Sequence, residues 1–96
     1  MFVGAARIVL GLSGNDSLKG KRGVVKSVIR RTRNRFNVAM SEVDDNDVHA
    51  RAVLGFAVVG NDKRVLNSVI DKIVDFIDEL GLAPVEDVRF SIEDYG

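Results

Sequence analysis

Cationic side chains are the residues of this sequence best suited to do chemistry. Between residues 19 and 35 the chain holds eight lysines and arginines and no acid, within the segment SLKGKRGVVKSVIRRTRNRFNVAMSEV. Ammonium and guanidinium groups at this density offer ion-pairing partners to a run of phosphates, so the segment predicts binding to a polyanion such as RNA. The candidate RNA-binding residues are Lys19, Lys21, Arg22, Lys26, Arg30, Arg31, Arg33 and Arg35.

A helix is expected to position these cations. An apolar line crosses the same segment at helical spacing and predicts a helix from Leu18 to Asn34. The line consists of Leu18, Val25, Val28, Ile29 and Thr32. On a helical wheel one stripe of cations lies beside this line, and it consists of Lys19, Arg22, Lys26, Arg30 and Arg33. Arg31 and Arg35 fall on the opposite flank. The short residues between the flanks are Gly20, Gly23, Ser27 and Asn34, so a phosphate backbone could approach closely there.

Folding alone does not favour a helix of this composition. Each of the two glycines costs about 1 kcal/mol relative to alanine, and positive charge in the first turn opposes the helix dipole. No acid four residues away offsets the repulsion among the cations. A binding role accounts for this pattern. The alternative is a solvated helix face that the acids of a second helix balance across the fold.

Composition indicates a single domain covering residues 1–96 of an ordinary soluble protein, with 46% hydrophobic and 29% charged residues. The net charge is zero, but residues 1–36 carry nine basic residues and one acid (+8), whereas residues 37–96 carry five and thirteen (−8). Because cysteine is absent, disulfides and thiolate sites are excluded. No signal peptide and no membrane span are expected.

The periodicity predicts a βαββαβ order. Strands are expected at 2–12, 38–43, 50–59 and 85–93, and helices at 18–34 and 63–80. Right-handed crossovers then place both helices on one face of a four-stranded antiparallel sheet. The predicted fold class is therefore α+β, with the ferredoxin-like split βαβ arrangement. Val88, Phe90 and Ile92 are expected to face inward in the last strand.

The other face of this sheet is expected to be unusually apolar for a surface in contact with water. Two interpretations stay open: the C-terminal tail covers it, or it forms a homodimer or partner surface. The candidate interaction residues are Val3, Arg7, Val9, Val53, Val59 and Arg89. No aromatic residue is predicted there, so recognition of single-stranded bases by stacking is not expected, and contact with the backbone of structured RNA fits better.

Other constellations give weaker signals. His49 with Asp44, Asp45 and Asp47 could attract a divalent cation, but the spacing lacks the features of a calcium loop, so a solvated turn is expected and no metal or cofactor is predicted. No catalytic pair or triad is recognisable, and a small-molecule enzyme is the third class of function considered. The acids of the second helix, among them Asp71, Asp75 and Asp78, form either a solvated face or a docking site for a basic protein such as a ribosomal protein.

The segments SLKGKR and RFNV, with MSEV after them, resemble signatures of the YlxP-like family of bacterial proteins of unknown function. The matching basic signature consists of Ser17, Leu18, Lys19, Lys21, Arg22, Arg35, Phe36, Asn37 and Val38. The resemblance implies a ferredoxin-like fold and a cytoplasmic location. Because genes of the family lie beside that for ribosome-binding factor A, it also implies a link to ribosome assembly or translation, with RNA of the small subunit as a candidate partner. It implies no catalytic residues. Gly20 departs from the family pattern, where many members carry an acid that would complete a capping box with Ser17.

Overall fold

The computed structural model describes all residues from 1 to 96 and contains six elements in the predicted order. They are β1 (Phe2–Gly11), α1 (Leu18–Arg35), β2 (Ala39–Asp44), β3 (Arg51–Gly60), α2 (Lys63–Glu79) and β4 (Val85–Asp94). Each boundary lies within one residue of its prediction, and the βαββαβ arrangement is confirmed.

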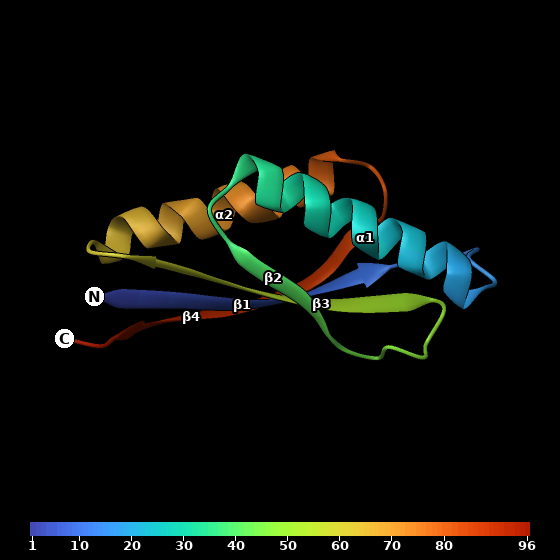
Figure 1. Ribbon diagram of the computed structural model, residues 1–96, viewed down its shortest axis with the longest axis horizontal. Helices are drawn as coiled ribbons and strands as arrows, with labels where there is room; N and C mark the ends of the chain where they lie inside the picture. Colours follow the sequence, from blue (N-terminus) through green and yellow to red (C-terminus); the bar gives the residue numbers. More distant parts are fainter.

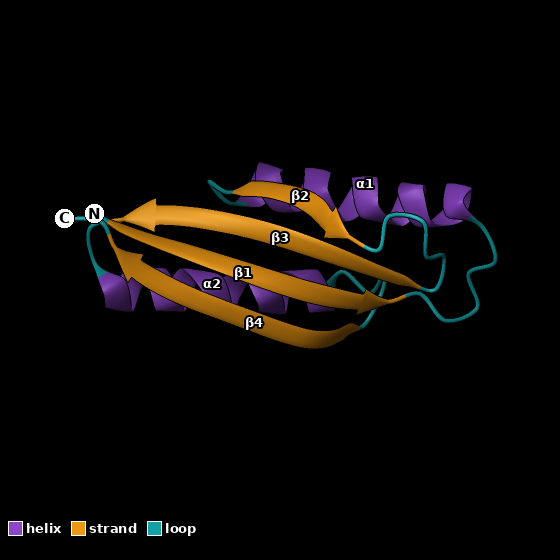
Figure 2. Ribbon diagram, turned by 90° about the horizontal axis from the view of Figure 1, so that it is seen from below, coloured by secondary structure: helices purple, strands orange, loops and turns teal.

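The four strands form one antiparallel sheet in the order β2-β3-β1-β4, and both helices cover the same face (Figure 1). Seen from the sheet side, α1 lies behind the β2 edge and α2 lies on the β4 side (Figure 2). The molecule is elongated, with extents of 45 × 21 × 19 Å. The molecule has two long edges. We call them the α1–β2 edge and the α2–β4 edge, after the helix and the edge strand that lie along each.

Alternation in the two central strands builds the core. Every second residue of β1 and β3 points toward the helices, and Ile8, Leu10 and Leu54 are fully buried there. Ile70 and Ile73 of α2 pack against this surface with at most 1% of their area exposed. Burial of this kind supplies roughly 1.5–3 kcal/mol per large aliphatic side chain, so this packing holds the helices on the sheet.

A side-chain cap begins each helix, and an aromatic contact joins the two helices. Ser17 caps α1 by accepting a hydrogen bond from the Gly20 amide at 3.0 Å, and Asp62 caps α2 in the same manner. The rings of Phe36 and Phe76 meet edge to face with centroids 5.5 Å apart, which ties the end of α1 to α2.

Two side chains lie on the predicted face of the sheet but differ from the expectation in their burial. Phe90 was expected to face inward; it does lie on the helix side, opposite Ala6, but 46% of it is exposed because β4 is an edge strand. Val53 was placed on the open face of the sheet, yet it is only 1% exposed, in a central strand between Val9 of β1 and Asp44 of β2.

Neither helix combines the length and the apolar character that a membrane crossing requires.

Candidate functional site

The outward surface of α1 is strongly cationic, and its cations are not neutralised by the protein itself. Seven of the eight predicted cations are exposed, and none of these seven forms an ion pair. They are Lys19, Arg22, Lys26, Arg30, Arg31, Arg33 and Arg35. The acids of α2 lie on another part of the molecule, so the expected alternative of a helix balanced across the fold finds no ion pair to support it.

The exposed cations are divided between two places. A shallow pocket in the surface of α1 is lined by Lys26, Ile29, Arg30, Arg33 and Asn34, all from this one helix. Arg35 instead borders a second pocket, shared with residues of β3 and α2. Three cations of the predicted stripe, Lys26, Arg30 and Arg33, thus line one pocket, and Arg35 borders another. We call the five exposed residues of the predicted stripe the cation stripe (Lys19, Arg22, Lys26, Arg30 and Arg33).

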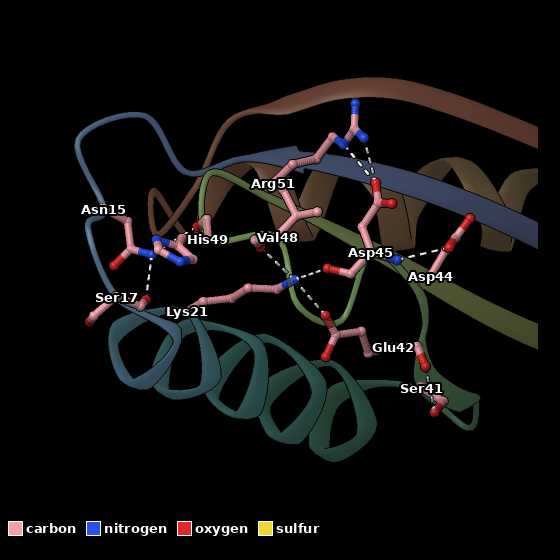
Figure 3. Close-up of polar contacts among 10 residues, drawn as sticks. All are labelled: Asn15, Ser17, Lys21, Ser41, Glu42, Asp44, Asp45, Val48, His49 and Arg51. Carbon is pink, nitrogen blue, oxygen red and sulfur yellow. Dashed lines mark hydrogen bonds and ion pairs between the residues drawn. The ribbon is translucent and has the colours of Figure 1, made fainter.

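Lys21 is the exception, and its assignment as a phosphate contact is wrong. The side chain is 1% exposed, and its ammonium group lies 2.9 Å from Glu42 Oε2 of β2 (Figure 3). It also donates to the carbonyl oxygens of Asp45 and Val48, the latter at 2.8 Å. Two carbonyl oxygens and one carboxylate thus surround the ammonium group inside the protein, and it is not available to a ligand.

The helical spacing contains the signal that would have identified Lys21 as buried. It lies three residues after Leu18 and four before Val25, so it continues the row of inward-facing residues that includes Val28 and Thr32. The residue type concealed this position, because a lysine within a basic run is ordinarily exposed.

Around Lys21, the segment between β2 and β3 is held to the first turn of α1. Asn15 donates from its amide to the carbonyl oxygens of Ser17 and His49, at 2.8 Å each. Arg51 binds Asp45 Oδ2 through Nε at 2.7 Å, and Asp45 has a φ of 53°, in the left-handed region. Aspartate adopts this region more readily than most non-glycine residues, and the Lys21 and Arg51 contacts hold Asp45 in it.

The same contacts engage two of the acids considered as ligands for a divalent cation. Asp45 is paired with Arg51 at 2.6 Å, and Asp44 lies 3.7 Å from Arg7. No group of three His, Cys, Asp or Glu side chains is arranged to hold a metal ion. The carbonyl groups of this loop surround an ammonium instead.

Gly20 has a structural explanation. A β-carbon at this position would lie 2.4 Å from Asn15 Oδ1. Any larger residue would displace the amide that joins α1 to the β2–β3 loop. The glycine that removes the capping-box acid therefore makes room for Asn15, which adds a second set of contacts to the Ser17 cap.

The open face of the sheet presents a shallow apolar depression lined by small residues, chiefly Ala5, Ala39, Gly55 and Ala57, beside the exposed Val43. The predicted face residues differ in exposure: Val59 is 64% exposed beyond the end of β2, Val3 and Val9 are partly buried, and Val53 is buried. Arg7 and Arg89 face each other across β1 and β4, each drawn toward a different carboxylate.

Comparison with solved structures agrees with this fold. A de novo designed protein with a ferredoxin fold superposes on the whole chain and 88% of its own length, with a TM-score of 0.50 and 17% sequence identity. A crystal structure provisionally assigned as a chlorite dismutase superposes on 98% of the chain with a TM-score of 0.54 and 10% identity, although the chain spans only 45% of that protein's length. Identities this low define the class alone: an α+β protein with a ferredoxin-like fold.

Sequence comparison identifies the family. A family model described as "Protein of unknown function (DUF503)" matches residues 3–90, and the chain belongs to this family. The uncharacterized protein YlxP of Bacillus subtilis (strain 168) is 36% identical over 62 residues, which cover 65% of this chain and 67% of that relative. The resemblance drawn from the SLKGKR and RFNV segments is thereby confirmed.

Removing the Lys21 ammonium should destabilise the protein. In Lys21→Met, Glu42 keeps a buried carboxylate oxygen that has no other partner, and we expect a loss of roughly 3–5 kcal/mol in the free energy of unfolding. Urea denaturation measures this loss. The double variant Lys21→Met, Glu42→Leu should recover part of it, whereas Lys19→Met on the exposed face should change stability by less than about 0.5 kcal/mol. Equal effects at positions 19 and 21 would contradict the assignment.

Proposed function

We propose that this protein is a non-enzymatic RNA-associated protein whose helix α1 contacts the phosphates of structured RNA. The observation that carries the proposal is the set of seven exposed cations on α1, none of them paired with an acid of the same molecule. Unpaired surface cations of one sign raise the local concentration of polyanions and steer their approach. The resemblance to the YlxP-like family supports ribosomal RNA, during assembly or translation, as the relevant class.

A second glycine of α1, Gly23, supports the same proposal. A β-carbon added at Gly23 would meet no atom within 4 Å, so the packing of the protein does not require glycine there. Glycine nevertheless costs a helix interior about 1 kcal/mol relative to alanine. The packing of the protein gives no reason for this loss of helix stability, whereas a ligand backbone that approaches α1 at Gly23 would give one.

The spacing of the cation stripe suits a phosphate backbone. The five cations lie between Lys19 and Arg33, fourteen helical steps apart, and so span about 21 Å at 1.5 Å per residue. Their long side chains flank the low surface at Gly23 and Ser27, so they can reach phosphate oxygens on a strand that lies along the helix axis. Such contacts fix the position of RNA without reading its bases.

The open face of the sheet argues for backbone contact over base stacking. The strand residues on that face include Ala5, Arg7, Ala57 and Ser91, and none is aromatic. Sheets of this topology that bind single-stranded RNA stack bases on exposed aromatic rings. Recognition through α1 and the shape of a folded RNA is therefore the mode that we propose.

Charge reversal on the cation stripe should weaken RNA binding in a salt-dependent manner. For Lys26→Glu, Arg30→Glu we expect at least a tenfold loss of affinity for a hairpin fragment of small-subunit ribosomal RNA. The slope of log K against log salt should also fall by about one unit per cation removed. Fluorescence anisotropy across a salt series measures both quantities. The matched control is Lys63→Glu, Arg64→Glu, an exposed basic pair on α2, which should bind as the parent does. Equal affinities for the parent and the α1 variant would refute α1 as the contact.

Filling the space above Gly23 should separate stability from binding. Gly23→Gln is expected to raise the free energy of unfolding by about 0.5–1 kcal/mol, because glutamine is the better helix former. The same variant should bind the RNA hairpin more weakly, because the new side chain occupies the surface between the flanking cations. Ser68→Gln on the exposed face of α2 serves as the control. A variant that gains stability and keeps its affinity would show that no ligand lies close to Gly23.

Self-association through the open face is the second candidate. It is favoured by the apolar depression around Ala5, Gly55 and Ala57, flanked by the exposed Val43 and Val59. If this face is an interface, analytical ultracentrifugation at micromolar concentration should show a dimer that Ala5→Lys converts to monomer. Val65→Lys, at an exposed apolar residue of α2, should leave the dimer intact. A monomeric parent protein would exclude this candidate.

A further inference from the structure

A groove with mainly apolar walls lies between α2 and β4. Helix α1 lies at the opposite edge of the sheet, behind β2 (Figure 2). Ile70 and Val74 of α2 form one wall, and Val88 and Phe90 of β4 form the other. Phe90 is 46% exposed there, which is unusual for a large aromatic residue on the helix-covered side of a sheet. The outer wall of the groove is completed by two exposed aspartates of α2, Asp71 and Asp75.

The strand that borders this groove has a free edge. β4 is ten residues long, and its only neighbour in the sheet is β1. Its outward N–H and C=O groups have no strand beside them, and no proline or bulge interrupts the strand between Asp87 and Asp94. Such an edge can accept another strand, with alternate side chains of the incoming segment directed into the groove under α2.

Charge determines what kind of segment the edge can accept. From residue 71 to residue 94 the chain carries eight acids and two cations. The acids are Asp71, Asp75, Asp78, Glu79, Glu86, Asp87, Glu93 and Asp94. Ion pairing within the protein neutralises little of this charge, because the only pair in the region joins Arg89 to Asp87 at 3.5 Å. An acidic segment would be repelled from this edge, and a basic one would be attracted.

We infer that the α2–β4 edge is a docking site for an extended basic segment of a partner protein. The segment adds to β4 as a fifth strand, so its main chain pairs with the free N–H and C=O groups. Its groove-facing side chains are apolar or are arginines and lysines, whose stems cover Phe90 and whose charged ends reach Asp71 and Asp75. This site is separate from α1 and does not depend on the proposed contact with RNA.

A second copy of the chain is the less suitable occupant. The other free edge strand is β2, with the sequence AMSEVD, and it carries two acids and no cation. Pairing β2 with β4, or β4 with another β4, would bring acidic strands together, which like-charge repulsion opposes. The cations of α1 lie on a helix, so a β2 or β4 strand of a second copy would not bring them to this groove. Charge complementarity therefore selects a foreign basic strand.

The test uses the full-length protein and a short synthetic peptide that alternates Thr with Val and Arg, so that Val and Arg occupy one face of a strand. Isothermal titration calorimetry measures binding to the parent protein, to Asp71→Lys, Asp75→Lys, and to Asp16→Lys, Asp47→Lys. The last variant changes the net charge by the same amount as the Asp71, Asp75 variant, but at two exposed acids away from α2. Two control peptides replace Arg by Glu or carry N-methyl groups along one edge, and the second of these cannot pair as a strand.

We expect the Arg peptide to bind the parent and the Asp16, Asp47 variant within twofold of each other, and the Asp71, Asp75 variant at least tenfold more weakly. Neither control peptide should bind. Hydrogen exchange should show protection of amides between residues 86 and 94 only with the Arg peptide. Binding that survives the Asp71, Asp75 change, binding of the N-methylated peptide, or unchanged exchange in β4 would overturn the inference. So would self-association of the parent protein that the Asp71, Asp75 change abolishes.

Discussion

The buried ammonium group of Lys21 is the interaction on which the surface of this protein depends. It lies at the inner face of α1 and joins that helix to Glu42 of β2 and to two carbonyl groups of the following loop. A buried charge is tolerated only where its partners replace water. Because all three partners come from one hairpin, the ion pair fixes how α1 sits over the β2 edge. The position of the exposed cations in space follows from this one inward-facing lysine.

Most of the fold could be predicted because each element carries a clear period. Alternation along β1 and β3 and the apolar row of α2 gave the correct elements, order and facing. The errors occurred where a residue's type and its position disagree. Lys21 follows the periodicity of the core but has the chemistry of the surface, and Phe90 has the chemistry of the core on an edge strand that α2 covers only in part. Local periodicity says which way a side chain points, whereas its burial depends on neighbours that only the assembled sheet supplies.

The exposure of the candidate RNA-binding cations could also be predicted for most of them. Wheel geometry placed the stripe from Lys19 to Arg33 on one exposed side, since helix geometry alone decides this. Ion pairing between those cations and the acids of α2 depends on the distance between the outer sides of the two helices. No pattern in the sequence gives that distance. The structure turns the Asp71 and Asp75 side toward β4, away from α1. The role of Gly20 was also hidden, because it depends on contact with Asn15 from a preceding turn.

The placement of unlike charges on the two long edges has a consequence for how this protein meets other molecules. The chain has no net charge, so its attraction to a distant charged body falls off faster with distance than that of a charged protein. Its separated charges nevertheless create a torque in an external field, and this torque turns the molecule before contact. Near a polyanion the α1 edge rotates forward and the α2–β4 edge rotates away. Most encounters with a polyanion would then begin with α1 in front. Added salt would lower the fraction of encounters that have this orientation more than it lowers the number of encounters.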